Sequence, residues 1–221
     1  MKRLHVSTKL TRLNISGNNL DFYIVDNVEE LITDPADEDK IPLWAEIWPA
    51  AQGLSRYIME RVDFSGCSVL DLGTGVGLTG VAGGLKGARV TFSDYHPEAL
   101  EVARINADLH GLQDPRFHLG DWRNFNIGYK FDCIIGSDII YDPKFFNYLI
   151  AIVRDCLKEG GRVIFSHPAR KLSFSFIEEF NRAGNWQETH SELPVAIPDS
   201  CLPNYEVHIH DMRQVSGDRS Q

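Results

Sequence analysis

The glycine-rich stretch V-L-D-L-G-T-G-V-G-L-T-G, residues 69–80, has the residue types of a loop that binds a small ligand. An apolar run predicts a buried strand, and glycines after it let the backbone approach a ligand closely. The glycines satisfy the dinucleotide pattern G-x-G-x-x-G from Gly75 onward. In a dinucleotide fold, however, the first glycine follows the strand directly. Here Gly73 comes earlier, and D-x-G-x-G-x-G beginning at Asp71 describes the stretch better.

The carboxylate of Asp71 argues against a pyrophosphate ligand, which it would repel, and no G-K-[ST] follows as in a phosphate-binding loop. S-adenosylmethionine fits instead, because it has an ammonium, a sulfonium and a ribose with two free hydroxyls. We predict that Asp71 and the backbone of Gly73, Thr74 and Gly75 bind this cofactor. The product of methyl transfer would be S-adenosyl-L-homocysteine.

Polar residues also follow the next two predicted strands. Asp94 lies 19 residues beyond Gly75 and is predicted to accept hydrogen bonds from both ribose hydroxyls. Asp121 is predicted to accept from the adenine amino group, and Trp122 to lie along the base. The alternatives are that Asp94 caps the helix beginning at Pro97 and that Trp122 is an ordinary core aromatic.

The elements that position these residues alternate between strand and helix, which predicts a mostly parallel sheet covered on both faces. Two late strands, W-Q-E-T-H and Y-E-V-H-I-H-D-M-R, have no helix between them and predict an antiparallel hairpin at one edge. Gly160-Gly161 is expected to end the helix before the fifth strand. The predicted strands cover residues 69–72, 88–93, 116–119, 131–136 and 162–166, and the predicted helices cover 49–62, 78–86, 97–110, 143–157 and 173–182.

The fold class is therefore α/β: a Rossmann-like, doubly wound, mostly parallel seven-stranded sheet with an antiparallel C-terminal hairpin, plus a small β-rich N-terminal extension. In that extension, residues 1–43, L-T-R-L-N-I-S and L-D-F-Y-I-V read as two strands with G-N-N as their turn. Residues 44–214 would form the main domain, and residues 215–221 a flexible tail.

Composition narrows the class of protein. The 221 residues carry a net charge of -9, so no broad basic surface is expected and nucleic acid is disfavoured as a partner. No apolar run approaches the ~20 residues that span a bilayer, and the N-terminus lacks a secretory signal. We expect a cytoplasmic monomer without membrane contact. Four cysteines without a C-x-x-C pair, Cys67, Cys133, Cys156 and Cys201, predict packed thiols and no metal.

Taken together, these motifs make the chain resemble the class I, seven-strand S-adenosylmethionine-dependent methyltransferases over residues 44–212. The fourth strand ends in I-I-G-S-D-I-I-Y-D-P, which lacks the N-P-P-[YF] of enzymes that methylate N6-adenine or glutamine. It contains D-x-x-Y, from Asp138 to Tyr141, and L-W-A-E-I-W-P-A-A precedes the first strand of the domain. With both, the chain is similar to the seven-strand protein-lysine methyltransferases that have a D-x-x-Y motif.

That resemblance implies roles for individual residues. Glu46 and Trp48 would close over the methionine end of the cofactor, and Ser137 would contact it. Asp138 and Tyr141 would form the amine pocket, with Asp138 orienting the attacking nitrogen. Capping of the next helix is an alternative role for Asp138, but Asp142-Pro143 already has the residues of a cap.

The predicted function is methylation of a lysine side chain of a protein with an exposed lysine. The alternative is a small-molecule amine or pyridine N-methyltransferase, since the same pocket suits any neutral nitrogen. The acidic segment 21–46, with nine acids and one base, would either steer a basic substrate or be a solvated loop. His167, after the fifth strand, is expected to be structural, with proton acceptance as its alternative.

Overall fold

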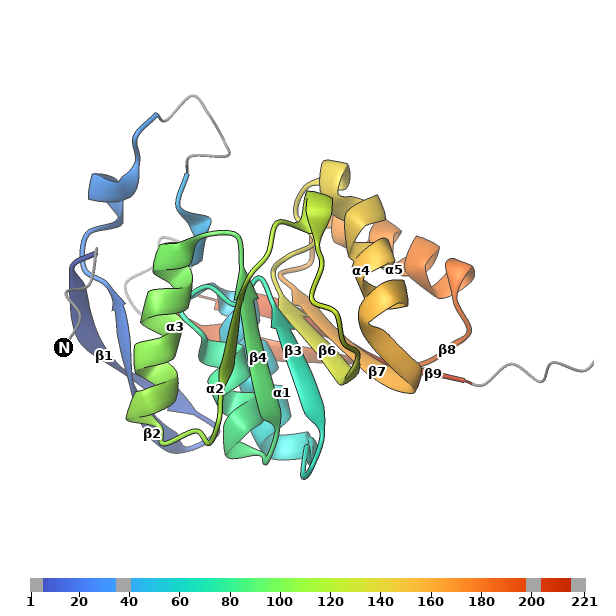
Figure 1. Cartoon of the computed structure of the whole chain (residues 1–221), viewed down its shortest axis with the longest axis horizontal. Helices are drawn as coiled ribbons and strands as arrows, with labels where there is room; N and C mark the ends of the chain where they lie inside the picture. Colours follow the sequence, from blue (N-terminus) through green and yellow to red (C-terminus); the bar gives the residue numbers. More distant parts are fainter. Residues whose placement is uncertain (1–5, 35–40, 198–203, 216–221) are drawn as a thin grey trace, which may run out of the picture.

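A seven-stranded sheet forms the centre of the protein, seen edge-on between its helices in Figure 1. The computed structural model describes residues 6–34, 41–197 and 204–215. From one edge to the other the strands are β5 (Arg116–Leu119), β4 (Arg89–Asp94), β3 (Ser68–Leu72), β6 (Phe131–Ser137), β7 (Leu157–His167), β9 (Asn204–Gln214) and β8 (Trp186–Ala196).

The first five of these strands run parallel, and β9 is antiparallel to both β7 and β8. This confirms the predicted doubly wound sheet and its reversed C-terminal hairpin. In a parallel sheet the carboxyl ends of the strands lie at one edge, so the polar residues that follow β3, β4, β5 and β6 are brought together there.

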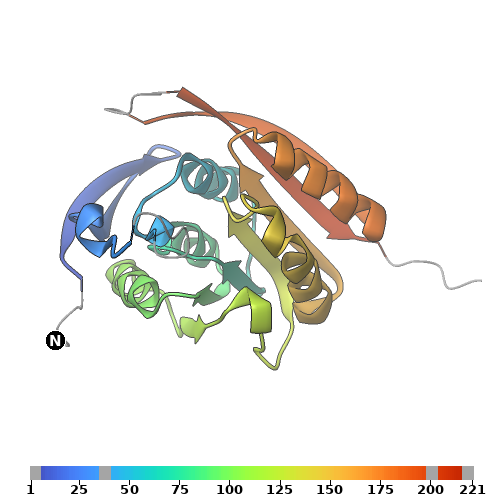
Figure 2. The same ribbon diagram turned by 90° about the horizontal axis from the view of Figure 1, so that it is seen from above.

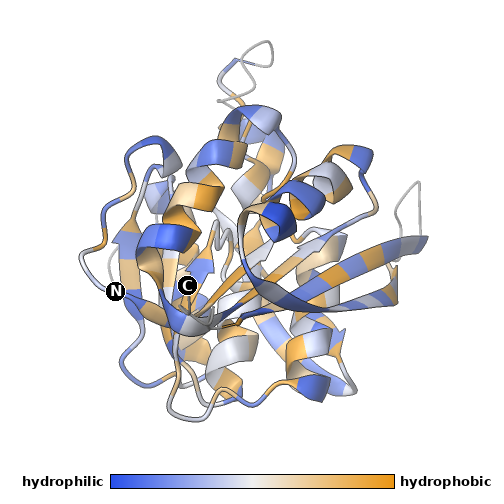
Figure 3. Ribbon diagram, turned by 90° about the vertical axis from the view of Figure 1, so that its right-hand side faces the viewer, coloured by the Kyte–Doolittle hydropathy of each residue, from blue (hydrophilic) through white to orange (hydrophobic). Residues whose placement is uncertain are grey.

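Helices cover both faces of the sheet, as Figure 2 shows from above. On one face lie α1 (Pro49–Arg61), α2 (Leu78–Leu85) and α3 (Pro97–Leu109), and on the other α4 (Phe146–Cys156) and α5 (Lys171–Ala183). Hydrophilic and hydrophobic residues alternate along several helices and along the long C-terminal strands (Figure 3). By contrast, α2 is buried along most of its length, and β9 has six consecutive buried residues. Short 3-10 helices cover Val28–Leu31, Leu43–Ala45, Trp122–Asn124 and Pro143–Phe145.

The fifth predicted strand differs from the one observed. We expected Gly160-Gly161 to end the preceding helix, and this was wrong: α4 ends at Cys156 and β7 begins at Leu157. The pairing of β6 with β7 shifts register between Phe131 and Cys133, so the two glycines lie in an irregular stretch of the strand. Gly160 has a φ of 69°, a backbone conformation that suits glycine there as well as it suits a helix end.

The N-terminal extension is a separate hairpin of β1 (Thr8–Ile15) and β2 (Asn18–Val25). Its turn is Ser16-Gly17, both with positive φ, and the asparagines expected in the turn begin β2. Phe22 is fully buried in a cluster that includes Leu78 and Phe92. The hairpin therefore packs on the main domain; the predicted boundary at residue 43 stays a prediction.

A buried amide fixes this hairpin in place. Asn106 of α3 is fully buried, and its Oδ1 accepts from the Tyr23 backbone N–H at 2.7 Å. Its Nδ2 donates to the carbonyls of Tyr23 and Val76, both at 2.8 Å. One side chain thus joins the hairpin, α3 and the glycine-rich loop.

Other expectations concern smaller features. Of the four cysteines, Cys133 and Cys156 are buried free thiols and Cys67 is a half-buried one, while Cys201 lies outside the described residues. The predicted tail lies outside them too, apart from Val215, whose backbone is bonded to Asn185. Among the described residues, no helix combines the length and apolar character needed to cross a membrane.

Replacing Asn106 with leucine leaves buried backbone groups of Tyr23 and Val76 without partners. We expect the free energy of unfolding to fall by about 3 kcal/mol. Urea unfolding measures this loss, and Asn147→Leu, at an exposed helical position, is the matched control with a change within about 0.5 kcal/mol. Equal stabilities of the two variants would contradict the assigned role.

Candidate active site

A cavity of about 640 Å³ lies at the carboxyl ends of the central strands. Its size falls in the range of small-molecule and cofactor sites. It brings together every predicted site residue except Asp71. Those lining it are Glu46, Trp48, Gly73, Thr74, Gly75, Asp94, Asp121, Trp122, Ser137, Asp138 and Tyr141.

Asp71 is fully buried at the end of β3 and does not line the cavity. Its carboxylate accepts from the hydroxyl of Thr74, from Thr79 Oγ1 at 2.8 Å and from the Gly80 backbone N–H at 2.9 Å. Sequence analysis predicted that Asp71 binds the positive end of the cofactor. The geometry instead makes it the support of the loop that does line the cavity.

The glycine loop passes under the backbone of the segment before α1. Gly75 has a φ of 53°, and a Cβ at that position would lie 3.0 Å from the carbonyl oxygen of Trp44. Trp44 is itself buried and lines the cavity. A glycine is therefore required for the loop and this segment to close on each other.

Asp94 ends β4 and lines the cavity from a buried position. Its Oδ2 accepts from the Gly75 N–H at 2.9 Å and its Oδ1 from the His96 N–H at 3.0 Å. The N-cap position of α3 is His96, so Asp94 is not the helix cap that the alternative interpretation required. Burial raises the pKa of Asp94, and its two backbone hydrogen bonds oppose that rise.

Asp121 and Trp122 follow β5. The Asp121 carboxylate accepts from the backbone and guanidinium of Arg123, which hold the pKa of that carboxyl below its usual range. The Trp122 ring is edge-on to Phe145, with centroids 5.3 Å apart, and approaches Gly73. Trp122 is therefore a wall of the cavity rather than a fully buried core aromatic.

The segment before α1 contributes a further part of the cavity wall. The Trp48 indole N–H donates to the Leu43 carbonyl at 2.7 Å, which fixes the ring orientation. Glu46 is exposed and also lines the cavity. Both residues predicted to close over the cofactor thus line the cavity.

Asp138 lies one residue beyond β6 with a φ of 56°, an unusual conformation for a residue other than glycine. Its backbone N–H donates to the Ser166 carbonyl of β7 at 2.9 Å. Its carboxylate, 6% exposed, forms a two-point ion pair with the guanidinium of Arg170. Strained residues of this kind concentrate at functional sites.

The cap predicted at Asp142 is present: its Oδ1 accepts from the Lys144 N–H at 2.9 Å, and Pro143 begins the 3-10 helix before α4. Asp138 is therefore not a helix cap. Tyr141 is 37% exposed, and its ring packs edge-on to Phe145 at 6.1 Å. The D-x-x-Y motif accordingly supplies one buried acid and one aromatic ring at the rim.

Three residues that line the cavity, Arg170, Arg123 and Phe145, were not predicted from the sequence. Arg170 comes shortly after β7, the neighbour of β6 in the sheet. A site at the carboxyl ends of adjacent parallel strands could have drawn attention to that loop. His167, at the end of β7, is fully buried and absent from the lining, which agrees with the structural role expected for it.

Comparison with known proteins now identifies the family. A family profile described as lysine methyltransferase matches residues 36–183. The chain belongs to this family. This membership confirms the resemblance that was based on the D-x-x-Y motif and the glycine loop.

Individual relatives agree. The chain is 36% identical over 132 residues to the electron transfer flavoprotein beta subunit lysine methyltransferase of Rattus norvegicus, covering 58% of this chain and 51% of that protein. It thus spans about half the length of this relative. It is 37% identical over 176 residues to the protein N-lysine methyltransferase METTL21A of Mus musculus, covering 75% of each.

A solved structure supports the fold. The 16S rRNA N2 G1207 methyltransferase RsmC of T. thermophilus, in complex with AdoMet and guanosine, superposes with a TM-score of 0.66 at 16% identity. The match covers 94% of this chain and 51% of that one. At this identity the likeness concerns the fold alone.

The buried position of Asp71 predicts a pH dependence of stability. Burial raises the pKa of this carboxyl from 3.8 to about 6, so the folded state holds the proton more tightly than the unfolded state. The associated stability is fully present below about pH 4 and is lost as pH rises through about 6, a change of about 3 kcal/mol.

Asp71→Asn removes this titration. The free energy of unfolding of the native protein minus that of the variant should fall as pH rises from about 4 to 7. Urea unfolding at several pH values measures the difference. For Asp155→Asn, an exposed control whose carboxyl has its pKa lowered by Arg154, the difference should not fall. A constant difference for Asp71→Asn would refute the prediction.

Proposed function

We propose that this protein is an S-adenosylmethionine-dependent N-methyltransferase that methylates a lysine side chain of a protein. The observation that carries the proposal is that Asp138 and Tyr141 of the D-x-x-Y motif line the same cavity as Gly73, Gly75 and Asp94. One cavity therefore holds residues suited to a nucleoside and residues suited to an amine.

The residues suited to a nucleoside, Gly73, Gly75 and Asp94, fit the cofactor. The Asp94 carboxylate accepts one backbone N–H on each oxygen, which leaves lone pairs for the hydroxyls of a ribose. The loop at Gly73 and Gly75 brings backbone close to the cavity, and Trp122 offers an apolar ring surface. When bound, S-adenosylmethionine supplies a methyl group already activated by the sulfonium.

Around Asp138 and Tyr141, the chain has to bind the substrate amine in its neutral form and exclude water. A free lysine has a pKa of about 10.4, so the site has to favour loss of its proton. The Asp138 carboxylate alone would favour the ammonium, but its pairing with Arg170 offsets that charge. Asp138 still has lone pairs to orient an amine N–H, and Tyr141 and Phe145 would exclude water from it.

A protein substrate is favoured over a small amine because both close relatives named above are protein-lysine methyltransferases. Tyr141, on the acceptor side, is 37% exposed, so this end of the cavity is accessible from the surface. The acidic segment 21–46 includes Glu46 at the cavity edge and would attract a basic substrate surface. We further propose a cytoplasmic monomer that acts without nucleic acid or membrane.

The cofactor assignment predicts the effect of Asp94→Asn. The substitution replaces one acceptor oxygen by a donor, and a hydrogen bond to a charged group contributes about 1.5–3 kcal/mol. The affinity for S-adenosylhomocysteine, measured by calorimetry, should fall about ten- to a hundredfold. Asp155→Asn, outside the cavity, should bind as the native protein does. An unchanged affinity of Asp94→Asn would exclude the ribose contact.

The acceptor assignment is tested by transfer of labelled methyl from S-adenosylmethionine into a cell lysate. We compare the native protein with Asp138→Asn, because asparagine tolerates the positive φ at this position, and with Asp138→Ala. With either variant, the label in a protein band that the native enzyme labels should fall at least tenfold. The affinity of both variants for S-adenosylhomocysteine should stay that of the native protein. Mass spectrometry of the band should place the methyl group on a lysine side-chain nitrogen.

Other outcomes would change the conclusion. Label confined to the small-molecule fraction would replace the proposal by the small-amine alternative. Label on a residue other than lysine would preserve the methyltransferase and overturn its acceptor. Undiminished labelling with both Asp138 variants would remove Asp138 from the site.

A further inference from the structure

Histidines gather at the C-terminal edge of the sheet, outside the cavity described above. They are His167 on β7, His208 and His210 on β9, and His190 on β8. Register explains the gathering, because His190 is opposite His210 and His208 is opposite both His167 and Glu192. Side chains at such positions point to the same face of the sheet.

Two of these imidazoles, those of His167 and His210, are buried and contact each other. His210 Nδ1 lies 2.6 Å from Glu188 Oε1, and His210 Nε2 lies 3.0 Å from His167 Nε2. Both ring nitrogens of His210 are therefore engaged within this inner part of the group.

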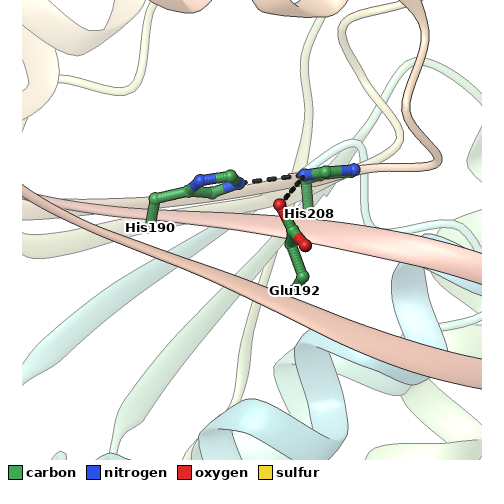
Figure 4. A group of neighbouring side chains, drawn as sticks. All are labelled: His190, Glu192 and His208. Carbon is green, nitrogen blue, oxygen red and sulfur yellow. Dashed lines mark hydrogen bonds and ion pairs between the residues drawn. The ribbon is translucent and has the colours of Figure 1, made fainter.

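In the outer part of the group, His190, Glu192 and His208 each have a possible metal-binding atom close to those of the other two (Figure 4). His208 Nδ1 lies 2.9 Å from His190 Nε2 and 3.7 Å from Glu192 Oε1, and all three atoms lie within 4.8 Å of one another. A tetrahedral zinc ion with ligands at about 2.0–2.1 Å separates neighbouring ligand atoms by about 3.3 Å. The two measured distances differ from that spacing by about 0.4 Å each, and the third pair of atoms, His190 Nε2 and Glu192 Oε1, has to close by up to about 1.5 Å.

A second carboxylate, that of Glu206, lies beside His208 and favours the tautomer that a metal ligand needs. Its other nitrogen, Nε2, lies 3.3 Å from Glu206 Oε1. An N–H on Nε2 donating to Glu206 leaves the Nδ1 lone pair directed at His190 and Glu192. Carboxylate partners of this kind fix the tautomer of metal-binding histidines. His208 is buried whereas His190 and Glu192 are exposed, so an ion can enter from solvent and keep a water as a further ligand.

We propose that His190, Glu192 and His208 form a binding site for Zn²⁺, with Glu206 positioning His208. Two imidazoles and one carboxylate are a ligand set that zinc accepts. The site joins the edge strand β8 to β9, so the bound ion would stabilise the last hairpin of the sheet. It is independent of the methylation proposed above.

The sequence analysis expected no metal because it considered only the cysteines. The signal lies in the alternation H-x-E on β8 and E-x-H-x-H on β9. Each pattern alone places histidines and acids on one face of a strand. Only the antiparallel register, with Glu192 opposite His208, brings them together.

The test uses the full chain without a purification tag. Zinc binding is measured by competition with a chromophoric chelator and by metal analysis after dialysis, and Co²⁺ serves as a spectroscopic probe. We expect one tightly bound Zn²⁺ per chain and visible Co²⁺ bands typical of nitrogen and oxygen ligands. The melting temperature should rise by about 5 °C or more when free Zn²⁺ exceeds its Kd a hundredfold.

Variants at the exposed ligands leave the core intact. His190→Gln and Glu192→Gln should each weaken Zn²⁺ binding at least tenfold and abolish the Co²⁺ bands. Glu206→Gln should weaken it about ten- to a hundredfold, as substitution of a supporting carboxylate typically does. His118→Gln, at a half-buried histidine on β5, should bind zinc as the native chain does.

Absence of saturable Zn²⁺ binding by the native chain would overturn the proposal. So would binding that is equally tight in His190→Gln and Glu192→Gln, because the ion would then be held elsewhere.

Discussion

A carboxylate buried at the centre of the sheet, that of Asp71, determines the shape of the part of the cavity that we propose binds the cofactor. An ionised group without partners in this position would cost several kcal/mol. The chain meets the requirement by bending so that two threonine hydroxyls and the N–H of Gly80 reach it. The same bend brings Gly73 and Gly75 to the cavity wall. The hydrogen bonds to the buried carboxylate beneath the loop thus determine the shape of the loop.

In the part of the cavity that we propose binds the methyl acceptor, a second buried charge has a different partner. Asp138 is also buried, but its charge is matched by the guanidinium of Arg170 rather than by neutral donors. Removing one member of such a pair is more costly than replacing both, because the other charge stays buried. The two acids therefore tolerate substitution differently. Asp71 depends on backbone and hydroxyl donors from the following loop and the first turn of α2, whereas Asp138 depends on a residue after the neighbouring strand.

Most of the fold could be predicted from the sequence because apolar runs, glycines and prolines mark the alternating strands and helices locally. The cavity residues followed from the rule that parallel strands end at one edge, which correctly placed Asp94, Trp122 and Asp138 around it. What could not be predicted depends on contacts across the chain. The pairing of Asp138 with Arg170 spans 32 residues, and the inward turn of Asp71 depends on side-chain directions that spacing does not give. Gly160 was misread because a positive φ suits a strand irregularity and a helix end equally.

The amide of Asn106 has a consequence for how motion spreads through the molecule. It holds the N-terminal hairpin through Tyr23 and the glycine loop through Val76, so neither can open without straining the other's hydrogen bonds. The hairpin contributes no residue to the cavity lining, yet it shares this side chain with the glycine loop. If the hairpin and the loop open as one unit, a ligand bound in the cavity would slow hydrogen exchange of the Tyr23 amide in β2.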